Sequence, residues 1–204
     1  MASALGHDDA RTRIDAAFTF AAAHIDPQHS EWARLHQIRG LWRLRVRELD
    51  GAADDLHDAE ARFAKIGPRA VIERAISTGY LAVVEILRHR VGEARKLLAA
   101  VVALDAFAPG DMRASYLDEV AAEIALATSD LAGARTALAR IEPTIDKSIE
   151  ARLVAHYHLL AAELARRAGD RDRAATERAA AADVLRRADI IDGAGYQDCA
   201  ACTR

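Results

Sequence analysis

The feature that most constrains the fold of this sequence is an alanine that returns at nearly regular intervals along the whole chain. Successive copies are 42, 42, 40 and 40 residues apart, at Ala10, Ala52, Ala94, Ala134 and Ala174. Because alanine is abundant here, the neighbouring positions must support the register. Four residues after the alanine, every copy except the last carries Ile or Leu, and seven residues after it every copy carries Ala, Val or Ile. This spacing places the side chains on one face of a helix.

A second small residue precedes the alanine by 12 positions in the last four copies: Gly40, Ala82, Ala122 and Ala162. Small residues on facing helices let two backbones approach closely. Periods of this length, with two helices in each, predict hairpins that stack and bury a face against their neighbours. Few aromatic residues, few prolines and no β-branched runs interrupt the pattern, so the sequence predicts an all-α protein.

The repeat runs from end to end, so we expect one domain over residues 1–204 with about nine helices. It comprises a half-repeat at 8–25, hairpins at 30–65, 69–105, 111–142 and 146–188, and a tail at 189–204. The half-repeat matches the second helix of a hairpin. It is either a natural cap or the remainder of a longer array. Ser129 or Asp130 is expected to cap the helix that follows, and Pro143 to end it.

The register of small residues resembles that of the tetratricopeptide (TPR) superfamily, whose units place a small residue in the first helix and an alanine early in the second. The matching pairs are Gly40 with Ala52, Ala82 with Ala94, Ala122 with Ala134, and Ala162 with Ala174. The Gly169-Asp170 turn is also similar to the family's turn. The period exceeds the family's usual 34 residues. In this respect the sequence most resembles the longer TPR-like arrays of bacterial signalling and transcription regulators. The resemblance implies a right-handed α-solenoid.

A solenoid of this kind has a concave inner wall formed mainly by the first helix of each hairpin, where peptides or partner helices bind. The resemblance implies that the wall has basic ends and an acidic middle. The candidate binding residues are Arg34, Gln37, Arg45, Tyr116, Glu119, Glu123, His156, Glu163, Arg166 and Arg167.

The first full hairpin carries opposite charges on its two halves. Arginines crowd residues 30–48 and acidic residues crowd 50–65. We expect these charges to face each other or to be solvated, rather than to form an arginine stripe that binds anions.

The overall charge excludes some classes of partner. A formal net charge of −3, from 28 basic and 31 acidic residues, does not predict nucleic-acid binding. No apolar run is long enough to span a bilayer, and the first residues do not resemble a secretory signal, so a cytoplasmic protein without a membrane partner is expected.

The histidines and cysteines are the candidate metal ligands and catalytic groups of this sequence. His156 and His158 are two residues apart on a helix and point in nearly opposite directions, so they cannot chelate one ion. Cys199 and Cys202 have the spacing of half a zinc site or of a redox dithiol, but no partner motif accompanies them. We therefore expect structural histidines, bystander thiols, no cofactor and no enzymatic activity. A thiol or zinc protein is the least favoured alternative.

Two binding functions remain. The first is a module that binds a protein or peptide along the inner wall. The second is a regulatory sensor domain that takes a small signal molecule or signalling peptide in the same groove.

Overall fold

A computed structural model describes residues 2–107, 111–145, 148 and 151–188, and within these ranges every regular element is a helix. The all-α prediction is confirmed for this part of the chain. Alanine, leucine, arginine and glutamate favour helices along the whole repeat. The helices are α1 Ala2–His24, α2 Glu31–Arg45, α3 Leu49–Ile66, α4 Val71–Leu87, α5 Val91–Ala103, α6 Ser115–Ala127, α7 Leu131–Ile145, α8 Ala151–Arg167 and α9 Arg171–Arg187, with 3-10 turns η1 Gly67–Ala70 and η2 Met112–Ala114.

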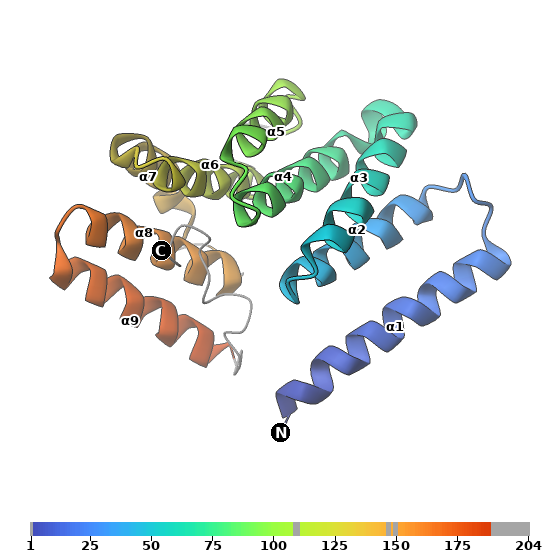
Figure 1. Cartoon of the computed structure of the whole chain (residues 1–204), viewed down its shortest axis with the longest axis horizontal. Coiled ribbons are helices and arrows are strands. Elements are labelled where there is room, and N and C mark those ends of the chain that lie inside the picture. Colours follow the sequence, from blue (N-terminus) through green and yellow to red (C-terminus); the bar gives the residue numbers. More distant parts are fainter. Residues whose placement is uncertain (1, 108–110, 146–147, 149–150, 189–204) are drawn as a thin grey trace.

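The helices pack as consecutive antiparallel pairs along an arc. Within the described residues, eight helices form the pairs α2 with α3, α4 with α5, α6 with α7 and α8 with α9. Each pair packs on the next, and the arc runs from α1 through α4 and α5 to α9 (Figure 1). The first helices of the pairs also touch one another in sequence, whereas consecutive second helices make fewer contacts in the described part of the chain. The first helices α2, α4, α6 and α8 therefore lie on the inner side of the curve.

The repeating alanines lie in the core, as expected from their register. Ala52, Ala94 and Ala134 are 0% exposed and Ala174 is 4% exposed. The small residues of the first helices are buried as well. At Gly40, a Cβ atom would lie 2.8 Å from Leu56 Cγ, so glycine is what allows α2 and α3 to come this close.

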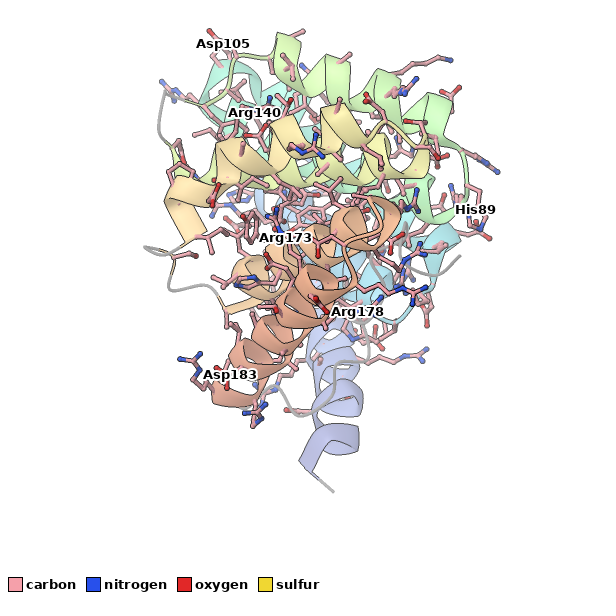
Figure 2. The ribbon with its side chains drawn as sticks, turned by 90° about the vertical axis from the view of Figure 1, so that its left-hand side faces the viewer. His89, Asp105, Arg140, Arg173, Arg178 and Asp183 are labelled. Atoms are coloured by element: carbon pink, nitrogen blue, oxygen red, sulfur yellow. The ribbon has the colours of Figure 1, made fainter. Side chains whose placement is uncertain are left out.

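The first helix of the chain departs from this pattern. Ala10 is only half-buried, because no helix takes the place of its hairpin partner among the described residues. Helix α1 packs on α2 through Phe18, whose ring lies 5.8 Å from that of Trp32, and its N-terminal half projects beyond the other helices (Figure 2). The sequence predicts about nine helices including this half-repeat; among the described helices eight form pairs, and α1 lies outside the pairing.

All four hairpins turn in the same way. One residue, five positions before each alanine, has a positive φ: Arg47 (64°), His89 (61°), Ser129 (60°) and Gly169 (84°). At each turn its N–H donates to a carbonyl three residues back, and the next N–H donates to a carbonyl five residues back, as in Asp130 N to Ala125 O at 2.8 Å. This is the Schellman arrangement, which satisfies the last carbonyls of a helix.

The cap that precedes α7 is Asp130 rather than Ser129. The Asp130 carboxylate accepts a hydrogen bond of 2.8 Å from Gly133 N, and Asp170 accepts one of 3.0 Å from Arg173 N at the same position of the last hairpin. Ser129 instead supplies the left-handed residue of the turn.

Some expected boundaries are wrong. Helix α1 begins at Ala2 rather than residue 8, and α6 begins at Ser115, after η2, rather than at 111. Pro143 does not end α7, which continues to Ile145. Ile145 is 6% exposed and packs in the core, and the Thr144 hydroxyl donates to Ile141 O at 2.7 Å, so packing and a side-chain bond carry the helix past the proline. The tail at 189–204 lies outside the described residues.

Candidate functional site

An apolar row on α4 faces the inner side of the arc. From Ile76 onwards, the α4 residues that are not buried are Ile76, Tyr80, Val83 and Leu87, and Ile72 continues the row one turn earlier. Their spacing of four, four, three and four residues places them in one stripe along the helix. Helices α3 and α5 cover α4 on its other sides, while α2 and α6 flank it. We call Ile72, Ile76, Tyr80, Val83 and Leu87 the inner row.

The neighbouring helix α2 extends this apolar surface. Ile38, which is 54% exposed, occupies the repeat position of Tyr80 one hairpin earlier. The two helices are held together by Gln37, whose Nε2 donates to Ser77 Oγ at 2.9 Å and to Glu73 O at 3.2 Å. Gln37 was expected to bind a ligand, and the structure gives it a bridging role between hairpins.

Exposed arginines border the inner row. Arg34 and Arg45 of α2 occupy the repeat positions of Ile76 and Leu87, and Arg69 comes just before α4. The Arg34 side chain is 59% exposed, 3.4 Å from Glu31 Oε1. Arg45 and Arg69 are exposed and form no ion pair within the described residues. The predicted basic end of the wall is therefore accessible.

The predicted acidic middle is engaged inside the protein with a histidine. His156 of α8 reaches α6, where its Nδ1 lies 3.1 Å from Glu119 Oε2 and its Nε2 lies 2.8 Å from Glu123 Oε1. The two glutamate side chains are only 5% and 4% exposed. Burial lowers the pKa of His156, but the charges and hydrogen bonds of Glu119 and Glu123 outweigh it and raise that pKa well above its usual value. A half-buried imidazolium therefore joins α6 to α8.

Tyr116 lies beside this cluster at the junction of the second and third hairpins. Its ring centroid is 4.5 Å from that of Tyr80, and a Cβ atom at Gly79 would lie 2.8 Å from its Cε1. Its hydroxyl is buried and has no hydrogen-bond partner among the described residues. Burial, together with Tyr80, Glu123 and Glu119 nearby, raises the pKa of Tyr116 well above its usual value.

The last three candidates form a separate cluster at the end of α8. Glu163, whose side chain is 1% exposed, accepts hydrogen bonds of 2.7 Å from Arg166 and 2.5 Å from Arg167. Burial raises the pKa of Glu163, but these two arginines outweigh it and lower that pKa. Arg167 also donates to Leu126 O at 2.5 Å, which ties α8 to α6. Of the three, only Arg166, 45% exposed, stays accessible to a partner.

The candidate residues therefore fall into two groups. Arg34, Arg45 and Arg166 are exposed, whereas the other candidates are mostly engaged within the protein. The sequence-based candidates do not include the inner row, because they are mainly polar side chains. The signal was present: α4 is apolar around most of its circumference, and a surface helix normally has a polar stripe where α4 has Ile72, Ile76 and Val83.

Charges within the first full hairpin face each other, as predicted. Asp55 of α3, which is 2% exposed, accepts hydrogen bonds from Arg39 at 2.8 and 2.6 Å and from Arg43 at 2.8 Å. His36 Nδ1 lies 3.0 Å from the same carboxylate. His158 repeats this geometry in the last hairpin, with Nδ1 2.7 Å from Glu177 Oε2. These arginines and histidines are used for packing within hairpins.

Two further expectations concern chemistry and membranes. The described residues contain no group of three or more His, Cys, Asp or Glu side chains placed to hold a metal ion. Cys199 and Cys202 lie outside the described residues. None of the helices described here has the length and apolar character that crossing a membrane requires.

Comparison with known proteins adds no identification. No protein-family description matches the chain, and no match is found among curated proteins.

Proposed function

We propose that this protein is a non-enzymatic binding module, a right-handed TPR-like α-solenoid that holds a segment of a partner protein along its inner face. The observation that carries the proposal is the inner row on α4. Five apolar side chains remain half-buried on the concave side of the arc, next to Ile38, which is 54% exposed. An apolar patch rimmed by polar residues is typical of a protein interaction site.

The surroundings of the row support binding rather than catalysis. The titratable cluster on the neighbouring helices, Glu119, Glu123 and His156, is mostly buried, and its members are engaged with one another. Such an ion-pair network holds α6 against α8. The rim side chains Arg34 and Arg45 are exposed to solvent, which suits a recognition surface.

A pair of charge-introducing variants tests this proposal. Ile76→Asp places a carboxylate in the inner row, and Val102→Asp places one on α5 at a residue that is 66% exposed and away from the inner face. Both proteins and the wild type are immobilised and incubated with extract of the source cells, and retained proteins are quantified by mass spectrometry. We expect specific partners to be retained by the wild type and by Val102→Asp but lost with Ile76→Asp. Equal retention by all three proteins would overturn the proposal.

A second candidate is a sensor domain for a small signal molecule. It is favoured by the Tyr116 hydroxyl and Glu123 Oε2, both buried and without hydrogen-bond partners in the described part of the chain. A ligand that supplies these partners would stabilise the α6–α8 junction. A saturable rise in melting temperature with a metabolite fraction, lost in Tyr116→Phe, supports this candidate. If no metabolite fraction raises the melting temperature in this way, the sensor candidate is excluded.

A further inference from the structure

The inner row and its surroundings define the shape of the partner. From Ile72 to Leu87 the row is about 22 Å long, at 1.5 Å per residue. Ile38 and the half-buried Leu41 lie alongside it on α2, so the two helices form parallel apolar ridges. Ridges of this kind accept side chains spaced at three and four residues from another helix.

The backbone of this surface favours a helical occupant. Helices α2 and α4 use their backbone N–H and C=O groups in their own ladders, so no free edge is offered to an extended chain. An extended partner pressed against the row would bury peptide groups without hydrogen bonds. A helix satisfies its own backbone and presents only side chains.

The charge around the row favours an acidic occupant. Arg45 lies near the Leu87 end and Arg69 near the Ile72 end, both exposed and without an ion pair among the described residues. Arg34 lies between them with only a loose contact of 3.4 Å to Glu31. The acids on the neighbouring α6, Glu119 and Glu123, are only 5% and 4% exposed and both contact His156, so they offer a partner little accessible surface.

The acid closest to the row on α4 itself is Glu73. It is half-buried at the edge of the row. The pKa of Arg113 is raised mainly by the hydrogen bonds that Arg113 donates to Asp111, and the charge of Glu73 adds to this. Its charge is thus partly offset by an arginine. The exposed charged side chains named beside the row, Arg34, Arg45 and Arg69, are therefore all basic.

We infer that the inner row binds an amphipathic helix of a partner protein whose apolar face is flanked by aspartate or glutamate residues. This inference rests on the proposed binding function. The partner's apolar side chains, at i, i+4, i+7 and i+11, pack against Ile38 and the inner row. Its flanking carboxylates pair with Arg45 and Arg69. The electrostatic contribution sets the partner's orientation and selects against basic helices.

Designed peptides test the inference with the complete chain. The acidic probe is a blocked peptide of about 18 residues with leucines at i, i+4, i+7 and i+11 and glutamates on both flanks, long enough to form a helix. The basic probe has lysine in place of every glutamate. A third probe scrambles the acidic sequence so that the leucines no longer share a face. Binding is measured by fluorescence anisotropy at two salt concentrations.

We expect the acidic probe to bind at least about tenfold more tightly than the basic probe, and to weaken as salt rises. The scrambled probe should bind no better than the basic one. Ile76→Asp should lower the affinity for the acidic probe by about tenfold or more, whereas Val102→Asp should leave this affinity unchanged. The double variant Arg45→Glu and Arg69→Glu should bind the acidic probe more weakly and the basic probe more tightly than the wild type does. Circular dichroism of each variant establishes that the fold is retained.

The outcomes separate this inference from the proposed function. Equal binding of acidic and basic probes, or no binding of the acidic probe, overturns the inference that the inner row binds an acidic helix. If Ile76→Asp nevertheless loses partners from cell extract, the binding module stands with a different kind of partner. If Ile76→Asp retains every partner and the probes also fail to bind, both ideas fall.

Discussion

Arg39 and Asp55 meet across the first full hairpin with two hydrogen bonds, Nε to Oδ2 at 2.8 Å and Nη2 to Oδ1 at 2.6 Å. The carboxylate also accepts a hydrogen bond from Arg43 and lies within hydrogen-bond distance of His36 Nδ1. A planar guanidinium matches a carboxylate in this side-by-side geometry, which fixes the relative position of the two helices. The pair therefore fastens α2, which carries Ile38, Arg34 and Arg45, to the rest of the arc.

The first prediction concerns the acid stability that Asp55 confers. Burial raises its pKa, but hydrogen bonds from His36 and Arg39 and the charges of Arg39 and Arg43 outweigh it and lower the pKa to about 2. A lowered folded pKa contributes stability that is fully present above the unfolded value near 4 and is lost as the pH falls toward 2. Asp55→Asn should reduce the free energy of unfolding at pH 7 by about 3 kcal/mol and flatten its decline below pH 4.

Urea unfolding at a series of pH values measures this effect. The neighbouring Asp54 is exposed, so Asp54→Asn serves as the matched control and should change stability by less than about 0.5 kcal/mol. Equal effects of the two substitutions would show that the Asp55 cluster does not fasten the hairpin.

The second prediction concerns the imidazolium between α6 and α8. Because the pKa of His156 is raised, its contribution is fully present below the unfolded value of about 6.5 and is lost as the pH rises through the folded value. His156→Gln leaves Glu119 and Glu123 buried without their counter-charge and should cost about 3 kcal/mol at neutral pH. The variant should also lose less stability than the wild type as the pH is raised.

Two further variants control this measurement. His57 is exposed on α3, so His57→Gln should be close to neutral. Adding Glu123→Gln to His156→Gln should restore part of the loss, because it removes one of the stranded charges. A double variant less stable than His156→Gln alone would contradict the assignment.

The third prediction uses the shared hairpin turn. Ser129 holds a φ of 60°, a conformation that glycine adopts without strain, so Ser129→Gly should stabilise the protein by about 0.5 to 1 kcal/mol. Gly169 lies at the same position with a φ of 84°, so Gly169→Ala should lower the free energy of unfolding by about 1 kcal/mol. Thermal unfolding gives both values. His89 at the equivalent turn lies at the edge of the molecule (Figure 2).

Gly92 provides the contrast for these turn variants. It is a helical glycine of α5 with open space around it, so Gly92→Ala should be neutral or stabilising. If Gly169→Ala behaves like Gly92→Ala, the left-handed turn is not a determinant of the fold.

The fourth prediction concerns the close approach of α2 and α3. A methyl group at position 40 would lie 2.8 Å from Leu56 Cγ and 3.2 Å from Asp55 Cβ, and neither neighbour can yield freely in a packed core. Gly40→Ala should therefore lower the free energy of unfolding by about 1 to 3 kcal/mol despite its better helix propensity. A rise in melting temperature would contradict the close packing of this hairpin.

The helices and their pairing could be predicted because the repeat expresses them in every copy. Residues such as Ala52 and Ala82 recur at fixed positions, and helical periodicity follows from local spacing alone. The turns could not be predicted as fully, since only Gly169 has the residue type that a left-handed turn favours. Arg47, His89 and Ser129 adopt it because the surrounding hydrogen bonds impose it.

The candidate site was predicted less well for a related reason. Which side chains meet between hairpins depends on how one hairpin stacks on the next, and the contacts of His156 with Glu119 and Glu123 arise only from that stacking. The i, i+4 spacing of the two glutamates was the available signal. Likewise local propensity predicts that Pro143 ends α7, whereas burial of Ile145 extends the helix to that residue.

The central claim is that the inner row is the surface that a partner occupies. It is tested most directly by placing a photo-crosslinking amino acid at position 76 and, in a second protein, at position 102, and irradiating each in the source cells. We predict discrete crosslinked partners from position 76, with the crosslinked peptide mapping to an apolar face of the partner, and none of these from position 102. The same partners from both positions, or no crosslink from position 76, would contradict the account.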